Sequence, residues 1–504
     1  MNLKRREFIR MSGIAAAGSL VIPPLLHSCN MSRLSDNAES YLNHFEVTRE
    51  LLQKVISAAM EKGADYADLY FEHSLNNTGA LEDGRVNSAY TNIAYGVGIR
   101  VLKGDQTGYA YSEVVSEEAM LNAARTAANI ADESGKYLNA RVTELTAPSY
   151  YAVRTPWEDY SVREKIPFIQ RMNDRIFSAD NRVSKVNVYL NDKTSYILFY
   201  NSEGLLAWDY RPLVYLAGVC IMEDKGRIEN FFSGRSFRKG SEFLTNELVD
   251  EMSDEVVKKT SLLFEAIRPE PGEMEVVVGA GESGILLHEA MGHAFEADFN
   301  RKDLSIFSDK MGKKIAENFV RIIDDGTIPG NRGSINFDDE GNLSKKTVLV
   351  DEGILTSYLH DRISSNHYNV DPTGNGRRES FRHIPIPRMR CTYMDNGPHK
   401  KEEIISSVRN GIYVESFSNG QVNIGQGDFT FFVKFGYLIE NGKLTKPIKD
   451  VNIIGNGPQA LADIVMAADD MLINDGVWTC GKNGQGAPVS MGIPTVKIKK
   501  LTVG

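Results

Sequence analysis

The segment His288-Glu289-Ala-Met-Gly292-His293 constrains the fold more than any other part of the chain. Two histidines on one helix with a glutamate after the first are typical of zinc peptidases, which space the histidines four residues apart. Here the spacing is five, which on a regular helix turns the two side chains about 140° apart, too far to share one ion. Gly292 allows the helix to end or bulge just before His293. The sequence therefore predicts a short metal-site helix that is interrupted at this point.

Two histidines do not complete a catalytic zinc site, which usually has three protein ligands and one water. The residue types leave several candidates for the third ligand. These are Glu296, Asp298, His360, His383 and the four cysteines Cys29, Cys220, Cys391 and Cys480. Most of them must have other roles, because a single histidine or aspartate is more often a surface or supporting residue than a ligand.

A second motif directly precedes the metal-site segment. The apolar run Glu275–Val278 is followed by Gly279-Ala-Gly281-Glu-Ser-Gly284, which has the glycine spacing of a dinucleotide-binding loop. Such a loop also needs a second buried strand that ends in an acidic residue about 20 residues further on. Asp298 is nearly at that distance, but its surroundings are not those of a buried strand. We therefore interpret the glycines as a tight strand-to-helix turn.

Composition and charge exclude several other classes of protein. The chain has 504 residues, of which 42% are hydrophobic and 25% charged, an ordinary globular composition. Its net charge is −10, and its basic residues do not form a stripe, so we predict no nucleic-acid binding. Four scattered cysteines do not form a disulfide framework.

Local patterns divide the chain into three folded domains and predict an α+β fold. We expect an N-terminal helix and strand domain at 41–145, a middle α+β domain at 150–270, and a C-terminal, largely antiparallel β domain at 273–504 that carries the short metal-site helix. The helices that we predict span Val47–Lys62, Ser116–Asp132, a segment starting at the capping box Ser161–Glu164, Asn246–Ile267, and segments near 401–409 and 458–473. Arg268–Gly272, with two prolines, is the clearest linker.

Residues 1–40 have the layout of an export signal. Lys4–Arg10 contains the pair Arg5-Arg6 and precedes the apolar stretch Met11–Leu26, which resembles a twin-arginine signal. Leu26-His-Ser-Cys29 resembles a bacterial lipobox, which predicts a lipid anchor on Cys29. We therefore expect an exported, periplasmic protein, held at a membrane if Cys29 carries lipid. The alternative is a basic amphipathic start on a cytoplasmic protein.

Longer motifs are similar to those of the TldD/PmbA family of metallopeptidases, on the TldD side. The similarity extends over essentially the whole chain after the signal. The segments that carry it are Gly63–Asp68, Gly96–Arg100, His288–Phe299, Gly374–Ser380, Pro385–Met389, Gly411–Val414, Gly427–Phe429, Tyr437–Gly442 and Cys480–Val489. PmbA-like chains lack the His-Glu-x-x-x-His motif, so the resemblance implies that this chain is of the catalytic type.

The resemblance implies one zinc ion per subunit, bound by His288, His293 and Cys480, with Glu289 as the general base. Glu296 and Asp298 are expected to orient the histidines. Arg377, Arg378 and His383 are expected either to hold a substrate carbonyl or carboxylate or to have a structural role. At Cys391 the chain departs from the family, which usually has asparagine there, so a second thiol competes for the assignment of the metal ligand.

The expected function is hydrolysis of small or unfolded peptides by a zinc-dependent peptidase of the TldD type. The expected partner is a PmbA-like subunit or a second copy of the chain, in a dimer. The alternative is a non-catalytic accessory subunit in which the metal only clamps a broken helix. A solvent-accessible fourth position on the ion distinguishes the two, because structural zinc sites are closed.

Overall fold

A computed structural model describes residues 33–131, 137–423 and 425–504. The elements discussed below lie within Asp36–Gly504, which packs as one unit. The predicted signal residues Arg5 and Arg6 and the predicted lipid site Cys29 lie outside the described residues. In the described part of the chain, no helix has both the length and the apolar composition needed to cross a membrane.

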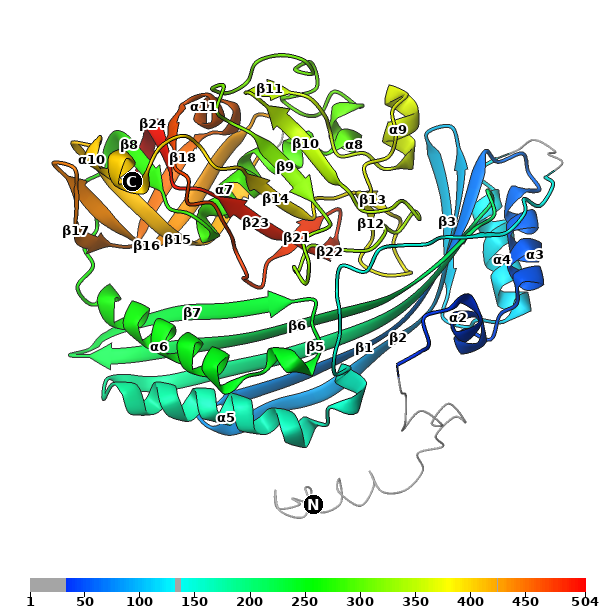
Figure 1. The fold of residues 1–504 in the computed structure, drawn as a ribbon, viewed down its shortest axis with the longest axis horizontal. Coiled ribbons are helices and arrows are strands. Elements are labelled where there is room, and N and C mark those ends of the chain that lie inside the picture. Colours follow the sequence, from blue (N-terminus) through cyan, green and yellow to red (C-terminus); the bar gives the residue numbers. More distant parts are fainter. Residues whose placement is uncertain (1–32, 132–136, 424) are drawn as a thin grey trace, which may run out of the picture. The chain divides into compact units, whose positions relative to one another are not determined.

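Long antiparallel strands form the first sheet (Figure 1). Its strands are β1 (Tyr66–Glu82), β2 (Arg85–Lys103), β3 (Gln106–Ser112), β5 (Val183–Asn201), β6 (Leu205–Asp224) and β7 (Arg227–Phe237), with the short β4 (Thr143–Glu144) parallel to β6. Their order is β3-β2-β1-β5-β6, with β4 and β7 both paired to β6. β1 pairs with β5 along its length, from Asp68 opposite Asn201 to Glu82 opposite Asn187. The sheet therefore runs through both the N-terminal and the middle segment, and the domain boundary between them stays a prediction.

Helices pack on this sheet at two places. Figure 1 shows α5 and α6 along the long strands and α3 and α4 together at the far end. The helices of this part are α2 (Ala38–His44), α3 (Arg49–Met60), α4 (Glu117–Ala128), α5 (Val162–Ala179) and α6 (Asn246–Leu263). Each of the four helices expected in this part is present, and the Ser161–Glu164 capping box is confirmed. Ser116 also caps α4, because its side chain accepts a hydrogen bond from the Ala119 N–H.

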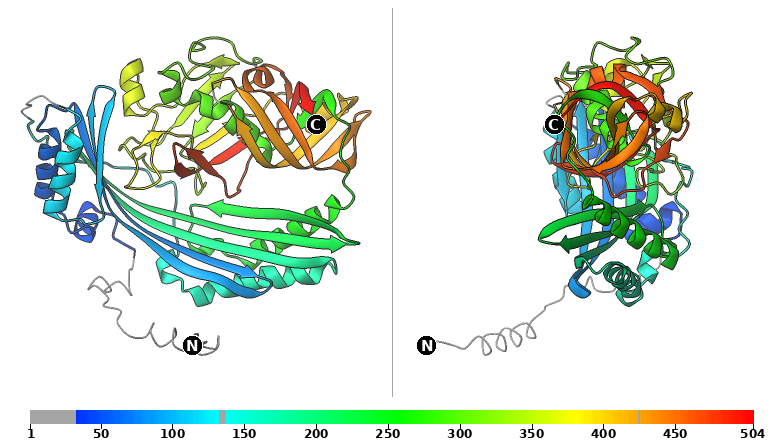
Figure 2. Two further views of the ribbon diagram at one scale, coloured as in Figure 1. Left: turned by 180° about the vertical axis from the view of Figure 1, so that it is seen from behind. Right: turned by 90° about the vertical axis from the view of Figure 1, so that its left-hand side faces the viewer.

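A β-barrel forms one part of the C-terminal region. Its strands are β8 (Gly272–Val278), β15 (Asn410–Val422), β16 (Asp428–Glu440), β18 (Val451–Asn456) and β24 (Val496–Val503), with β17 (Lys443–Ile448) and β19 (Ile464–Ala467) at its margins. β15 pairs with both β8 and β16, which closes the ring seen in the right-hand view of Figure 2. The β8–β15 pair is parallel and the other pairs are antiparallel.

A second C-terminal sheet and two short hairpins lie beside the barrel. The sheet has the order β11 (Ile354–Leu355), β10 (Lys346–Asp351), β9 (Ile322–Asp325), β14 (Cys391–Met394), β23 (Ser490–Ile493) and β20 (Leu472–Ile473). The hairpins pair β12 (Gly376–Arg377) with β13 (Ile386–Pro387), and β21 (Thr479–Lys482) with β22 (Gln485–Pro488). The predicted α+β fold with a β-rich C-terminal region is confirmed.

Short helices complete the C-terminal region, and one of them corrects a prediction. They are α7 (Ile285–Leu287), α8 (Ala297–Asn300), α9 (Arg362–Tyr368), α10 (Lys401–Ser406) and α11 (Gly457–Ala462). The helix predicted over 458–473 is wrong beyond Ala462, where β19 and then β20 follow. Ile464-Val-Met-Ala467 pairs instead with β24, since β-branched residues suit a strand and the neighbouring edge supplies the hydrogen bonds.

Candidate metal centre

The helix that carries the two histidines widens at the predicted position. α7 continues as a turn of π-helix, His288–Gly292 (η4), and then as a 3-10 turn, His293–Phe295 (η5). The backbone N–H of His293 donates to the carbonyl of His288, a five-residue hydrogen bond. Residues five apart lie on one face of such a turn, as residues four apart do on a regular helix. The wide turn therefore explains how the two imidazoles meet.

Gly292 is needed in this turn because it has no side chain. Its φ of −59° is an ordinary helical value, so the turn does not need the conformational freedom of glycine. A Cβ at this position would collide with the sulfur of Met389, which is fully buried. Close packing of Met389 against the backbone therefore requires glycine at this position.

Three candidate metal ligands converge on one point. The ligand atoms of His288, His293 and Cys480 all lie within 4.8 Å of one another, and the three side chains are buried. His293 Nε2 lies 3.3 Å from Cys480 Sγ. Both ring nitrogens of His288 lack a hydrogen-bond partner among the described residues. A buried imidazole without any partner is costly, and a metal ion would satisfy it.

The electrostatics of the thiol fit the same role. Burial on its own raises the pKa of Cys480, but the neighbouring His288 and His293 reverse this effect and bring it to about 4. The sulfur is therefore a thiolate at neutral pH, the form that binds metal. Two imidazoles and one thiolate form a donor set that zinc accepts.

A buried charge cluster holds His293 from behind. Its Nδ1 lies 2.8 Å from Glu296, and Lys482 lies 3.0 Å from Glu296 and 2.7 Å from Asp298. Burial raises the pKa of Glu296, but Lys482 and His293 outweigh burial and lower it to about 2. Burial raises the pKa of Asp298, and Lys482 opposes that shift. Glu296 contacts a motif histidine, as expected, whereas Asp298 contacts Lys482 instead of a histidine.

Two further residues support the site but were not predicted from the sequence, Lys482 and Arg388. Lys482 follows Cys480 by two residues on β21, so strand alternation places both side chains on one face, and this spacing could have identified it. Arg388 donates to the carbonyls of Cys480 and Gln485 and so fixes the hairpin that presents the thiol. No local pattern could have identified that contact.

Glu289 lies at the accessible side of the cluster. Its side chain is 25% exposed, whereas that of His293 is 6% exposed. One carboxylate oxygen of Glu289 lies 3.9 Å from His293 Nε2. The position combines access to water with proximity to the candidate ligands.

The predicted substrate-binding residues make other contacts. Arg377 donates to the carbonyls of Met389 and Pro488, at 2.5 and 2.8 Å. Arg378 donates to Tyr109 and to the carbonyl of Asp339. His383 is half-buried and lies 3.1 Å from the hydroxyl of Ser380. These contacts favour the structural alternative for both arginines.

Two other candidate ligands lie apart from the cluster. Cys391 is fully buried in an apolar cluster with Ile323 and Tyr393, and burial raises the pKa of its thiol well above the usual range. His360 is buried beside Tyr358 and Tyr368, and burial lowers its pKa to about 4. Neither residue belongs to the group of convergent donors.

Comparison with known proteins agrees with the motifs. The sequence models of the PmbA/TldA metallopeptidase match domain 1 at 67–131, the central domain at 155–264 and the C-terminal domain at 271–504. A Metalloprotease TldD homolog of Buchnera aphidicola is 37% identical over 92% of this chain and 98% of its own length. A Zinc metalloprotease TldD homolog of Saccharolobus solfataricus is 26% identical over 90% of this chain and 99% of its own.

The fold has a solved counterpart as well. The crystal structure of TldE from Thermococcus kodakarensis superposes with a TM-score of 0.70 at 18% identity, over 90% of this chain and 100% of that one. At this identity the likeness concerns the fold alone. The family assignment rests on the matched domains and on the Buchnera relative, which is aligned over nearly its whole length. The chain therefore belongs to the PmbA/TldA metallopeptidase family.

Proposed function

We propose that this chain is a zinc-dependent peptidase that hydrolyses small or unfolded peptides, with Glu289 as the general base. The observation that carries the proposal is the convergence of three buried donors, His288, His293 and Cys480, within 4.8 Å, with an accessible carboxylate beside them. The zinc in the name of the Saccharolobus relative supports the choice of metal.

The donor set defines what the ion would contribute. Zinc held by His288, His293 and Cys480 would supply a Lewis acid that polarises the scissile carbonyl and makes water acidic enough to attack it at neutral pH. Two neutral imidazoles and one thiolate leave a net positive charge for that purpose.

Glu289 carries the proton transfers in this proposal. Its carboxylate accepts a proton from the attacking water as the water oxygen forms a bond to the carbonyl carbon. The protonated carboxyl then donates to the amide nitrogen while the carbon–nitrogen bond breaks, so that a carboxylic acid and an amine leave. Partial exposure of the side chain lets both water and peptide reach it.

The buried charges behind the site keep it in one geometry. Glu296 fixes the Nδ1 side of His293, so Nε2 is the nitrogen that faces Cys480. Lys482 pairs with both Glu296 and Asp298, which stabilises these carboxylates away from water. Such partners orient metal-binding histidines.

The rival function is an accessory subunit with a purely structural metal. A structural zinc site is closed by four protein ligands. The described residues supply three convergent donors, and the neighbouring Glu289 is partly exposed. This arrangement favours a site with an open position and therefore the peptidase.

We propose further that the active form is a dimer. The partner that we favour is a paralogous chain, because the TldE protein of Thermococcus kodakarensis has the same fold as this chain. A second copy of this chain is the alternative. Size-exclusion chromatography with and without the paralogue distinguishes the two, and an active monomer would contradict both.

The test of the peptidase combines metal removal with an unstructured peptide mixture. Zinc content is measured first, with one ion per chain expected. Chelation should then abolish cleavage, and added zinc should restore it, in the presence of the partner subunit. No cleavage with any divalent metal would exclude the peptidase and leave the accessory subunit.

We propose an exported location on the basis of the sequence alone. Replacement of Arg5 and Arg6 by lysine should retain the protein in the cytoplasm, because lysine lacks the planar guanidinium that the twin-arginine receptor reads. Incorporation of a labelled fatty acid that disappears in Cys29→Ala would establish the lipid anchor. Unchanged export of the lysine variant would exclude the twin-arginine route.

A further inference from the structure

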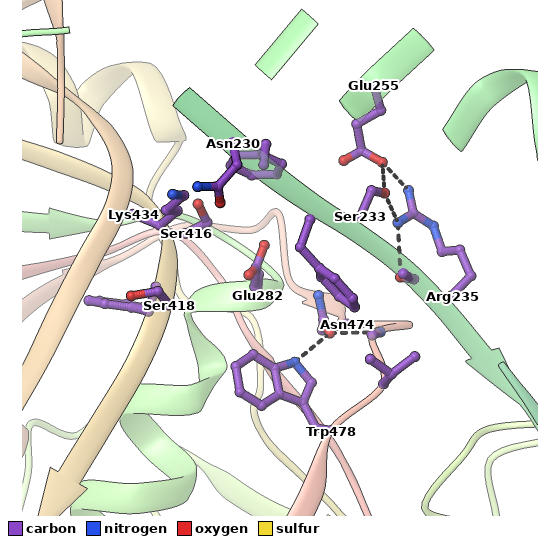
Figure 3. Close-up of a pocket in the computed structure, with 16 residues that line it drawn as sticks. Asn230, Ser233, Arg235, Glu255, Glu282, Ser416, Ser418, Lys434, Asn474 and Trp478 are labelled. Atoms are coloured by element: carbon purple, nitrogen blue, oxygen red, sulfur yellow. Dashed lines mark hydrogen bonds and ion pairs between the residues drawn. The ribbon is translucent and has the colours of Figure 1, made fainter. Parts of the chain in front are cut away.

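A cavity of about 400 Å³ opens between β7, β15, β16 and the loop Asn474–Trp478 (Figure 3). Its apolar walls are aromatic, with Phe231, Phe232, Phe417 and Trp478 among the lining side chains. A cavity of this size accommodates one large side chain or a chain terminus.

The walls of this cavity are held in place. The backbone N–H of Ser236 on β7 donates to the carbonyl of Asp475 at 2.7 Å, which joins the strand to the loop. The indole N–H of Trp478 donates to Asn474 at 3.0 Å, which sets the plane of the ring (Figure 3). The cavity therefore exists before any ligand binds.

Two polar groups in the cavity have no partner. Glu282 lines the cavity and is half-buried, and no hydrogen bond or ion pair joins its carboxylate to another described residue. The hydroxyl of Ser416, a residue that is 1% exposed, is likewise without a hydrogen-bond partner among the described residues. Native proteins rarely leave such groups unsatisfied unless a ligand or water meets them.

The charges around Glu282 otherwise cancel in pairs. Arg235 lies 2.9 Å from Glu255, and Lys259 pairs with Glu415. Burial, the largest cause, raises the pKa of Glu282 to about 7, and these four groups are the next largest influences on it. Lys434 also lines the cavity, but the carboxylates that act on it are those of Asp450 and Glu229. Glu282 is thus an acid without an ion-pair partner among the described residues, in a cavity with aromatic walls.

The cavity adjoins the metal centre along two segments. Trp478 precedes Cys480 by two residues, about 7 Å along a strand. Glu282 precedes His288 by six residues of nearly continuous helix, about 10 Å along its axis. A peptide bound at the metal centre can therefore place a neighbouring residue in this cavity.

We propose that this cavity is a substrate subsite that binds a positively charged group of the peptide, with Glu282 as the residue that selects it. The inference rests on the peptidase function proposed above. An ammonium or guanidinium group would pair with the carboxylate, and the ring faces of Trp478 and Phe232 would attract the same cation. The charge can come from a lysine or arginine side chain or from the peptide amino terminus, and the test separates these sources.

Binding is measured on metal-loaded Glu289→Gln protein, so that no turnover is required. Trp478 is one of three tryptophans in the chain, and its fluorescence reports occupancy of the cavity. The probes are neutral peptides in which one lysine moves along the sequence, each matched with norleucine at the same position. At one position we expect the lysine peptide to bind at least ten-fold more tightly. Acetylated and free amino termini are compared in the same way.

Glu282→Gln keeps the shape of the side chain and removes its charge, so the ten-fold preference should fall below about three-fold. Glu270→Gln, in the exposed linker, makes the same amide-for-acid replacement away from the cavity and should retain the preference. Glu282→Lys should instead favour peptides with an acidic residue at that position. Thermal unfolding confirms that each variant is folded.

Three results would overturn the subsite. The first is equal binding of lysine and norleucine peptides at every position, with either amino terminus. The second is an unchanged preference in Glu282→Gln. The third is a preference of the unmodified cavity for acidic peptides. Because binding is read without cleavage, an inactive protein with an intact preference would reject the peptidase and keep the subsite. A protein that cleaves peptides but lacks the preference would support the peptidase and reject the subsite.

Discussion

Individual residues of the metal centre differ in what surrounds them. His293 has its outer nitrogen fixed by Glu296, whereas neither nitrogen of His288 has a partner among the described residues. Cys480 is a thiolate, and Cys391 is a buried neutral thiol in an apolar cluster. Because these surroundings differ, we expect each replacement to affect zinc binding and peptide turnover differently.

Glu289→Gln should separate catalysis from metal binding. The amide is nearly isosteric with the carboxylate but cannot accept the proton of the attacking water, so kcat should fall by about 10²–10⁴. Zinc content by elemental analysis should stay at the level of the unmodified protein. Loss of zinc in this variant would instead make Glu289 a ligand and leave the mechanism without its base.

Cys480→Ala and Cys391→Asn form a matched pair of thiol replacements. The first removes the thiolate from the convergent donors, so zinc and peptide turnover should disappear together. The second places the residue usual in the family in a cluster that contains no other candidate ligand, so zinc should remain. The reverse outcome, with zinc lost only in Cys391→Asn, would identify the other thiol as the ligand.

Single elements of the fold depend on contacts that their own sequence does not contain. Met389 packs against the backbone of the π turn at His288–Gly292, where a Cβ on Gly292 would meet its sulfur. Helix α2 ends at His44, whose ring nitrogen lies 2.9 Å from that of His73 on β1. In both cases a residue distant in the sequence contacts the turn or the helix end.

Gly292→Ala should destabilise the π turn and weaken zinc binding. The added Cβ collides with the sulfur of Met389, which has no free space because it is fully buried. Overpacking of this kind costs about 1–3 kcal/mol of unfolding free energy. Gly481→Ala is the control, because a Cβ there meets no atom within 4 Å, so its unfolding free energy should change by less than about 0.5 kcal/mol. Equal effects in the two variants would contradict the packing argument.

The His44–His73 contact should make stability depend on pH. Burial lowers the pKa of both histidines from 6.5 to about 4, and their mutual repulsion adds to this for His44. The unfolded chain takes up protons below pH 6.5, while the folded chain does so only near pH 4. The contribution to stability is therefore complete above pH 6.5 and is lost as the pH falls from 6.5 to 4.

Urea unfolding at pH 7 and pH 5 measures this dependence. His73→Gln should have a smaller difference in unfolding free energy between the two pH values than the unmodified protein. Replacement of the exposed His367 by glutamine should leave the difference unchanged. If His73→Gln kept the full difference, other groups would have to account for it.

In the whole molecule, buried ion pairs join the first sheet to the C-terminal region. Arg100 on β2 donates to Asp68 on β1 at 2.8 Å and to Glu340 at 2.6 Å. Arg211 on β6 donates to Asp339 at 2.5 Å. All of these side chains are buried, so separation of the two parts would leave charges unpaired. These ion pairs therefore attach the C-terminal region, which contains the metal centre, to the first sheet.

Arg100→Met should test that support. Removal of Arg100 leaves the buried carboxylate of Glu340 without its ion-pair partner and leaves Asp68 only the longer contact with Arg378, at 3.4 Å, which costs about 3–5 kcal/mol. Arg171→Met is the control, because its pair with Asp250 is partly exposed to water and should contribute much less to stability than a buried pair. Denaturant unfolding measures both. A loss at Arg100 no larger than at Arg171 would mean that the buried pairs do not hold the two parts together.

The sequence by itself determined the features that depend on residues close together along the chain. Capping residues predicted the starts of α4 and α5, periodicity predicted α3, and the sequence also predicted α6. The spacing of His288 and His293 predicted that the helix ends or bulges near Gly292, because a regular helix would keep the two rings apart, and the structure has a widened turn there. These signals act over a few residues, so the chain carries them without reference to its fold.

Only the tertiary structure decided how distant segments combine. β1 and β5 lie more than 100 residues apart, yet they form the centre of one sheet, and no local pattern specifies that pairing. Lys482 becomes a partner of Glu296 only after the β21–β22 hairpin docks beside the π turn. The apolar residues after Ala462 form a strand rather than a helix because β24 offers an edge there. Hydrogen bonds and buried charges between remote segments depend on where the folded chain places their partners, which a linear pattern does not contain.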